Sequence, residues 1–124
     1  MLNKKEKNII VPYTAKGNLR LSELKKFSEL EQKKFGILEP KKEFIRKFNL
    51  KELDLVIVPG IVFDKNRHRI GYGYGYYDRF LKNLSNHVIK IGIAFEFQLV
   101  DKIPHEMHDV AMDIVITENF ILKK

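Results

Sequence analysis

The stretch Leu55-Val56-Ile57-Val58-Pro59-Gly60 decides the fold class of this chain. Four consecutive apolar residues, three of them β-branched, end at a Pro-Gly turn signal. A run without polar alternation is typical of a strand that is buried on both faces, as in a parallel sheet. The stretch therefore predicts an inner strand of a parallel sheet.

The residues that follow supply the partners of this strand. Val88–Phe95 is predicted to be a second buried strand and Ile114–Ile116 a third. A hairpin is predicted around Asp64–Arg67, and a helix over Tyr76–Leu84. The inner face of that helix is predicted to carry Tyr77, Phe80, Leu81 and Leu84. Strands and a helix in this order indicate an α/β fold with a mainly parallel sheet.

The N-terminal part of the chain has weaker signals. Apolar segments at Asn8–Pro12 and Leu19–Leu21 flank the turn residues Thr14–Asn18 and predict a hairpin-like pair of strands. Apolar residues recur every three positions in Leu24–Lys34, which favours a short exposed helix. Lys41–Leu53 is mixed and moderately helical.

Length and composition limit how the chain is organised. The 124 residues, 44% hydrophobic and 31% charged, suffice for one compact core, so a single domain over residues 1–124 is expected. No window approaches a membrane span and the N-terminus lacks the apolar segment of a secretory signal, so a cytoplasmic location is expected. The absence of cysteine excludes disulfides, thiolate zinc sites, iron–sulfur clusters and cysteine nucleophiles, so any metal should have oxygen ligands.

The net charge of +7 is carried by the N-terminal part. Residues 1–51 hold 14 Lys and Arg against 6 Asp and Glu, whereas the remaining residues hold 9 against 10. Lysine pairs among glutamates indicate a solvated face, with an acidic small molecule such as a polyphosphate as the alternative partner. Nucleic acid is not expected, because a polyanion-binding strip would use arginine and interleaved aromatic residues, and this part has only Arg20 and Arg46.

The strongest functional signal is the glycine loop, Gly71-Tyr72-Gly73-Tyr74-Gly75, which precedes the predicted helix. Three glycines at alternate positions allow backbone amides to converge on one point, which favours an anion such as phosphate. The loop matches neither the Walker pattern nor the dinucleotide fingerprint. The alternative is a strained turn that packs its tyrosines against the sheet.

Side chains in and after the loop add candidate ligands. Tyr72, Tyr74 and Tyr76 offer flat faces to a heterocycle such as adenine or a pterin. Asp78 falls in the first helical turn, where a carboxylate can cap the helix or bind Mg²⁺. Asp109 is a second candidate oxygen ligand, with a turn carboxylate as the alternative. The two histidines close to it have a poor spacing for zinc.

Several blocks of the sequence together form a recognisable set. They are FGILEP at 35–40, LVIVPGIVFD at 55–64, RIGYGYGYYDRFL at 69–81, IGIAFEFQ at 91–98, Ile103–Pro104, His108–Asp109 and DIVITE at 113–118. In order and spacing these blocks resemble the 5-formyltetrahydrofolate cyclo-ligase family, also called 5,10-methenyltetrahydrofolate synthetases, over nearly the whole chain.

The resemblance implies a three-layer α/β fold of the CoA-transferase or ribose-isomerase type. It also implies an ATP- and Mg²⁺-dependent ligase of folate and one-carbon metabolism, which converts 5-formyltetrahydrofolate to 5,10-methenyltetrahydrofolate and releases ADP and phosphate. By position, Arg69 and Tyr76 would be catalytic, Tyr72–Tyr76 would touch the folate, and Asp78 and Asp109 would hold Mg²⁺. The implied ATP-binding residues are Arg69, Ile70, Gly71, Tyr72, Gly73, Tyr74, Gly75, Tyr76 and Tyr77.

Compared with this family, the chain lacks the usual N-terminal segment, so an N-terminally truncated version of the fold is expected. Tyr74 also stands where relatives usually have Gly or Lys. A strand without its usual neighbour predicts self-association through an exposed sheet edge. The alternatives to a working cyclo-ligase are a nucleotide- or folate-binding remnant without turnover and an RNA-associated basic domain.

Overall fold

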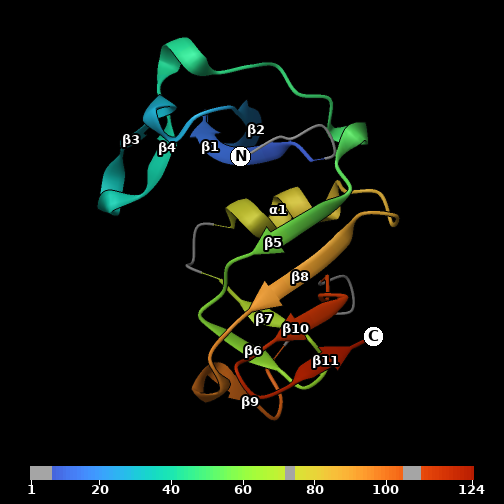
Figure 1. Ribbon diagram of the computed structural model, residues 1–124. Coiled ribbons are helices and arrows are strands. Elements are labelled where there is room, and N and C mark those ends of the chain that lie inside the picture. The colour runs from blue at the N-terminus through green and yellow to red at the C-terminus, as the bar shows by residue number, and fades with distance from the viewer. Residues whose placement is uncertain (1–6, 72–74, 105–109) are drawn as a thin grey trace. The chain divides into compact units, whose positions relative to one another are not determined.

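The computed structural model describes residues 7–71, 75–104 and 110–124 (Figure 1). The chain forms two compact units, Met1–Glu52 and Leu53–Lys124, here called unit 1 and unit 2. The single domain predicted for residues 1–124 stays a prediction. In the described part of the chain, no helix is long and apolar enough to cross a membrane.

Unit 1 is built on an antiparallel hairpin. β1 (Ile9–Ala15) pairs with β2 (Asn18–Leu24) along the full length of both strands. The turn between them consists of Lys16 and Gly17, which both have positive φ, the geometry favoured in a two-residue hairpin turn. The predicted hairpin is confirmed, with a tighter turn than Thr14–Asn18.

The helix predicted over Leu24–Lys34 is wrong. Leu24 is the buried last residue of β2, and the chain continues through a 3-10 turn, η1 (Phe27–Glu29). The next residues form β3 (Leu30–Gln32), which pairs antiparallel with β4 (Leu38–Pro40). Pairing between these two short strands overrides the three-residue recurrence of apolar side chains.

The moderately helical pattern of Lys41–Leu53 gives only short 3-10 turns. None of the turns for which an N-cap is described in unit 1 has a side-chain cap, and so short a turn has little stability without one. The remaining 3-10 turns of unit 1 are η2 (Lys34–Gly36), η3 (Lys42–Phe44) and η4 (Leu50–Glu52).

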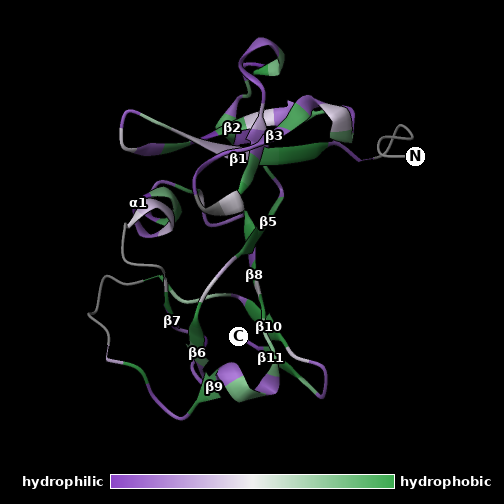
Figure 2. Ribbon diagram, turned by 90° about the vertical axis from the view of Figure 1, so that its left-hand side faces the viewer, coloured by the Kyte–Doolittle hydropathy of each residue, from purple (hydrophilic) through white to green (hydrophobic). Residues whose placement is uncertain are grey.

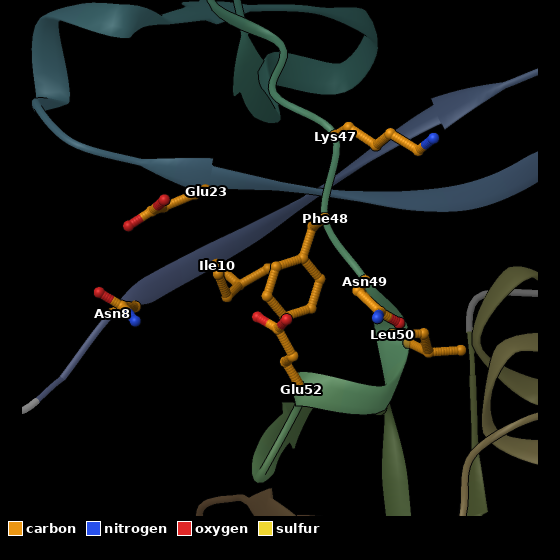
Figure 3. Close-up of a pocket in the computed structure, with 8 residues that line it drawn as sticks. All are labelled: Asn8, Ile10, Glu23, Lys47, Phe48, Asn49, Leu50 and Glu52. Carbon is orange, nitrogen blue, oxygen red and sulfur yellow. The ribbon is translucent and has the colours of Figure 1, made fainter.

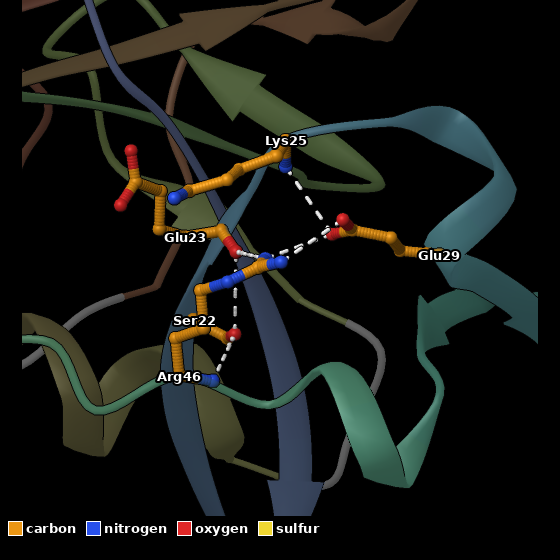
Figure 4. A network of polar contacts seen from close by, with 5 residues as sticks. All are labelled: Ser22, Glu23, Lys25, Glu29 and Arg46. Atoms are coloured by element: carbon orange, nitrogen blue, oxygen red, sulfur yellow. Dashed lines mark hydrogen bonds and ion pairs between the residues drawn. The ribbon is translucent and has the colours of Figure 1, made fainter.

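A polar network ties the segment after β4 to the hairpin (Figure 4). The guanidinium of Arg46 donates to the two carboxylate oxygens of Glu29 at 2.8 and 3.0 Å, and to the backbone oxygen of Glu23 at 2.8 Å. The backbone N–H of Arg46 donates to the Ser22 hydroxyl at 2.9 Å, and that of Lys25 donates to Glu29 at 3.2 Å. Because this ion pair is bidentate and Glu29 is buried, its geometry is well defined.

Acid should destabilise unit 1 through this network. The hydrogen bonds from Arg46 lower the pKa of Glu29 from 4.5 to about 2, against the opposing effect of burial. Because the folded-state pKa is depressed, the stabilisation is complete above about pH 4.5 and is lost as the pH falls through about 2. Urea denaturation at a series of pH values, followed by the amide NMR signals of β1 and β2, measures this loss.

The matched variants are Glu29→Gln and Glu31→Gln. Glu31 forms an exposed ion pair with Lys33, so its substitution should leave stability and acid sensitivity close to those of the parent chain. Glu29→Gln should be less stable at neutral pH and should lose less stability on acidification. An acid dependence in Glu29→Gln equal to that of the parent chain would contradict the assignment.

Unit 2 contains a four-stranded sheet in the order β11-β10-β8-β5. Three of its strands run parallel, namely β5 (Leu55–Val58), β8 (Ile89–Ile93) and β10 (Ile114–Ile116). The fourth, β11 (Ile121–Lys123), is antiparallel to β10. The predicted α/β fold with a mainly parallel sheet is confirmed.

A second sheet lies on one side of the four-stranded sheet (Figure 2). Its order is β7-β6-β9, with β6 (Val62–Asp64), β7 (Arg69–Ile70) and β9 (Leu99–Val100). β6 and β7 form the predicted antiparallel hairpin, and the 3-10 turn η5 (Glu96–Gln98) leads into β9.

The helix α1 (Tyr76–Lys82) lies on the same side of the four-stranded sheet as β6 and β7 (Figure 2). Phe80 and Leu81 are buried, while Tyr77 and Leu84 are partly buried. The predicted helix is confirmed with Tyr77, Phe80 and Leu81 on its inner face, but it ends at Lys82, so Leu84 lies beyond it.

The core of unit 2 lies between the four-stranded sheet and β6. Phe63 of β6 is fully buried, and a Cβ at Gly92 of β8 would stand 2.5 Å from a carbon of its ring. Val58 and Val115 both pair with Gly92, so they point to the same side as this glycine, and both are buried. The expected burial of the strands on both faces is wrong, since Ile57 is 57% exposed. The described elements of unit 2 cover one face of the sheet.

The turn between β6 and β7 is organised by Asp64, whose side chain is fully buried. One carboxylate oxygen accepts hydrogen bonds from the backbone N–H groups of Asn66 and His68, each at 2.9 Å. The other accepts from the N–H of Ile103, also at 2.9 Å. These bonds fix the hairpin and attach the segment after β9 to it.

Candidate functional site: the loop between β7 and α1

The described residues hold both ends of the glycine loop. Arg69 and Ile70 precede the loop, Gly71 begins it, and Gly75 ends it before Tyr76, the first residue of α1. The predicted site residues Tyr72, Gly73, Tyr74 and Asp109 lie outside the described residues.

Arg69 connects the loop to two other parts of unit 2. Its Nε donates to the backbone oxygen of Pro59, just after β5, at 2.9 Å, and its Nη1 donates to Oδ1 of Asp78 on α1 at 2.7 Å. The Arg69 side chain is only 4% exposed. A Cβ at Gly71 would stand 2.7 Å from Nη2, so the guanidinium reaches the start of the loop. Arg69 thus brings a buried cation to the predicted anion site.

Gly75 ends the loop in a conformation that favours glycine. Its φ is +73° at the N-cap of α1, and its carbonyl oxygen accepts a hydrogen bond from the N–H of Arg79. A Cβ at this position would stand 2.7 Å from Nη1 of Arg79. The Arg79 guanidinium lies over the ring of Tyr76, 5.4 Å from its centroid. The end of the loop therefore lies next to the Tyr76 ring and to a second cation, Arg79.

Tyr77 packs within unit 2. Its ring makes an edge contact with Phe80, with centroids 6.4 Å apart, and lies 5.9 Å from the guanidinium carbon of Arg69. Burial raises the pKa of Tyr77, and the charge of Arg69 opposes that rise. The phenol is therefore neutral at physiological pH.

Asp78 pairs with Arg69, a partner that was not expected when Asp78 was predicted to cap the helix or to bind Mg²⁺. It forms the ion pair with Arg69 while 62% of its side chain stays exposed. Mg²⁺ commonly binds proteins through one or two carboxylates and completes its shell with waters and phosphate oxygens, so one exposed carboxylate fits such an ion. Among the residues that the structure describes, no group of three acidic or histidine side chains forms a metal cluster.

Sequence reasoning did not single out Arg79 or the carbonyl of Pro59. The spacing of Tyr76 and Arg79, three positions apart on a helix, is a signal that predicts their contact. No local pattern predicts the bond from Arg69 to Pro59, since it depends on how β5 and β7 are placed.

Unit 1 contains a cavity of about 610 Å³ that holds none of the predicted site residues (Figure 3). Figure 3 shows the side chains of Ile10, Phe48 and Glu52 directed toward one another. The residues that line the cavity are Asn8, Ile10, Glu23, Lys47, Phe48, Asn49, Leu50 and Glu52.

Comparison with known proteins shows the family to which this α/β unit and its glycine loop belong. A family model for the 5-formyltetrahydrofolate cyclo-ligase family matches residues 1–118, and the chain belongs to this family. Curated relatives include the 5-formyltetrahydrofolate cyclo-ligases of Haemophilus influenzae (40% identical; 70% of this chain and 48% of that protein) and Escherichia coli K12 (36% identical; 88% and 60%). The mouse cyclo-ligase is 33% identical over 82% of this chain and 53% of its own.

Solved structures agree with the family assignment. The NMR structure of Aquifex aeolicus 5,10-methenyltetrahydrofolate synthetase has a TM-score of 0.79 at 33% identity and covers 96% of this chain. The Mycoplasma pneumoniae 5,10-methenyltetrahydrofolate synthetase has a TM-score of 0.63 at 27% identity and covers 86%. The chain spans 59% and 54% of these two structures, and about half the length of the curated relatives it matches. The predicted family and fold class are confirmed.

Substitution of Gly75 should destabilise the protein, and substitution of Gly36 is the control for the effect of the backbone conformation alone. Gly36 also has a φ of +73°, but a Cβ there would meet nothing within 4 Å. Gly36→Ala should therefore lower the free energy of unfolding by about 1 kcal/mol, the cost of a left-handed conformation for a residue with a Cβ. Gly75→Ala should cost that amount and also displace Arg79 from Tyr76.

Thermal unfolding and the side-chain NMR signals of Arg79 measure the two effects. Gly75→Ala should shift the Arg79 guanidinium signals, and Gly36→Ala should leave them in place. Unchanged Arg79 signals in Gly75→Ala would contradict the close approach of the Arg79 guanidinium to residue 75.

Proposed function

We propose that this chain binds ATP at the glycine loop and converts 5-formyltetrahydrofolate to 5,10-methenyltetrahydrofolate. The observation that carries the proposal is the buried guanidinium of Arg69 at the start of the loop, in a chain that belongs to the cyclo-ligase family. Arg69 lies against Gly71 at the start of the loop, and Arg79 lies against Gly75 at its end. Two cations at these positions favour an anion such as a polyphosphate.

The proposed reaction activates the formyl oxygen of the substrate by transfer of the γ-phosphate of ATP. Nitrogen 10 then attacks the formyl carbon, phosphate leaves, and the products are 5,10-methenyltetrahydrofolate, ADP and phosphate. This chemistry asks the protein mainly to position the triphosphate in line with the acceptor and to neutralise charge. We assign the backbone from Arg69 to Tyr77 to ATP, and Tyr72–Tyr76 to the folate as well.

Arg69 and Tyr76 are the proposed catalytic residues. Because Asp78 and the Pro59 carbonyl hold the Arg69 side chain, its charge would be fixed before substrate arrives and would need little reorganisation. The Arg79 guanidinium already lies over the Tyr76 ring, and this ring would present its edge to the bound ATP and folate.

We assign Mg²⁺ to Asp78 and Asp109, where the ion would neutralise phosphate charge when bound.

Self-association through a sheet edge is proposed for β5, which stands at one end of the described four-stranded sheet. The cytoplasmic location predicted from the sequence stays a prediction.

Arg69→Lys should weaken ATP binding at least tenfold. Lysine keeps the charge, but a single ammonium cannot reproduce the planar fork that reaches both Pro59 and Asp78. Isothermal titration with ATP and Mg²⁺ measures the affinity, and the control is Arg20→Lys, an exposed arginine of unit 1. ATP affinity that is the same in both variants would overturn the site. An absorbance assay for methenyltetrahydrofolate, run on the parent chain, separates the enzyme from a binding remnant without turnover.

The two aspartates should differ in how they depend on metal. Asp109→Asn should weaken ATP binding only when Mg²⁺ is present, because it removes a proposed metal ligand. Asp78→Asn should also weaken metal-free binding, since it releases Arg69. Titrations with Mg²⁺ and with EDTA test this. Equal losses with and without Mg²⁺ in Asp109→Asn would remove that residue from the metal site.

A further inference from the structure

Residues 59–61, here called the exit segment, follow β5 and are held by side chains through all three of their carbonyl oxygens. The Pro59 oxygen accepts a hydrogen bond from Nε of Arg69 at 2.9 Å. The other two oxygens accept from Nε2 of Gln98, at 3.3 and 3.0 Å. Arg69 and Gln98 therefore hold neighbouring peptide groups of one short segment.

The main chain and the core give the exit segment its remaining contacts. Pro59 has no N–H, so it cannot donate a backbone hydrogen bond. The N–H of Ile61 donates to the backbone oxygen of Ile70 on β7 at 2.8 Å. A Cβ at Gly60 would stand 2.8 Å from a carbon of the Phe63 ring, so this residue lies against the core. The position of the Pro59 carbonyl therefore depends on the side-chain bonds as well as on β5.

The Gln98 side chain is fixed in one orientation by its own contacts. Gln98 is the partly buried last residue of η5, and its Oε1 accepts from the backbone N–H of Phe95, the N-cap of this turn, at 2.9 Å. An amide turned the other way would place its oxygen against two carbonyl oxygens and its NH₂ group against an N–H. The turn η5 thus presents an oriented donor group to the exit segment.

The exit segment in turn helps to determine where the Arg69 guanidinium lies. The Arg69 side chain is only 4% exposed, so an Nε group that lost the Pro59 oxygen would have little access to water as a replacement. Its other side-chain partner in this region, Asp78, is 62% exposed. Displacement of the exit segment would therefore move the guanidinium or leave a buried donor without its acceptor.

We propose that Gln98 is a positioning residue for the glycine-loop site, because it holds the exit segment where the Pro59 carbonyl fixes the Arg69 guanidinium. The inference rests on the proposed function, since it connects Gln98 to ATP through Arg69. The side-chain bonds described for Gln98 go to Phe95 and to the exit segment. The effect of Gln98 on ATP binding is therefore transmitted through the exit segment to Arg69.

Two substitutions of Gln98 remove its bonds to the exit segment in different ways. Gln98→Glu keeps an oxygen for the N–H of Phe95, but a carboxylate has no hydrogen to donate, and Gln98→Met removes both polar groups without adding charge. Each variant should shift the NMR signal of the Arg69 Nε–H group and speed its exchange with water. Each should also weaken ATP binding about threefold to tenfold, the effect of one net hydrogen bond.

The control variant is Phe97→Glu. It places the charge of Gln98→Glu on the neighbouring residue of η5, whose side chain is 83% exposed. The Arg69 signal and the ATP affinity should both stay close to those of the parent chain. Thermal unfolding of all the variants measures stability, which a purely structural role of Gln98 would lower without moving the Arg69 signal.

A double-mutant cycle with Arg69→Lys tests whether Gln98 acts through Arg69. Residues that act as one unit are not additive, so Gln98→Met should reduce ATP affinity less than about twofold further when Arg69→Lys is already present. Isothermal titration with ATP and Mg²⁺ measures all four chains. Losses that are additive in the double variant would overturn the inference.

Failure of the inference and failure of the proposed function give different results. A parent chain that binds ATP, with the Arg69 signal in the same place in both Gln98 variants, would overturn the role of Gln98 alone. A parent chain that binds no ATP would overturn the proposed function, and with it the assignment of Gln98 to an ATP site.

Discussion

The buried carboxylate of Asp64 is the interaction on which the described part of unit 2 depends. Its two oxygens accept three backbone hydrogen bonds, two within the β6–β7 turn and one from Ile103 beyond β9. Removal of this side chain would leave three N–H groups without their acceptor, and buried polar groups without partners are costly. Next to it, Arg67 donates from Nε to the backbone oxygen of Met112, and the N–H of Met112 donates to the oxygen of Arg67. The hairpin is therefore held at Ile103 and at Met112, which both lie between β9 and β10.

The candidate site follows from this hairpin. Once β7 is fixed, Arg69 extends to the end of β5 and to the first turn of α1, so three elements of unit 2 meet at one guanidinium. The glycines at the loop ends serve this arrangement, because a Cβ at Gly71 or Gly75 would approach an arginine side chain within 2.7 Å. A buried cation beside a glycine-lined loop is a fixed electrostatic feature, which suits a reaction whose main demand is the placement of phosphate.

The sequence predicted the features that rest on local patterns. The β-branched runs predicted the parallel strands, the turn residues predicted both hairpins, and the spacing of Tyr77, Phe80 and Leu81 predicted the buried side of α1. It failed where pairing at a distance decides the outcome. The segment after Leu24 carries a helical recurrence, yet Leu30–Gln32 pairs with Leu38–Pro40, and Glu29 is held by Arg46, seventeen positions later.

The same reason explains what was missed at the site. The ion pair of Asp78 with Arg69 could not be read from the motif, because it depends on the register of β6 with β7 and on the start of α1. The burial of the strands was overestimated because apolar runs show which residues can be covered, and Ile57 shows that the described chain does not supply the cover. The assignments of Tyr72, Gly73, Tyr74 and Asp109 stay predictions.

The central claim is that the glycine loop holds the triphosphate next to Arg69. The most direct measurement is a crystal structure of the chain with Mg²⁺ and a non-hydrolysable ATP analogue. The account predicts phosphate oxygens within hydrogen-bond distance of backbone N–H groups between Gly71 and Gly75, with the Arg69 guanidinium still held by the Pro59 carbonyl. A nucleotide bound elsewhere, for example in the unit 1 cavity beside Phe48, with the glycine loop empty, would contradict it.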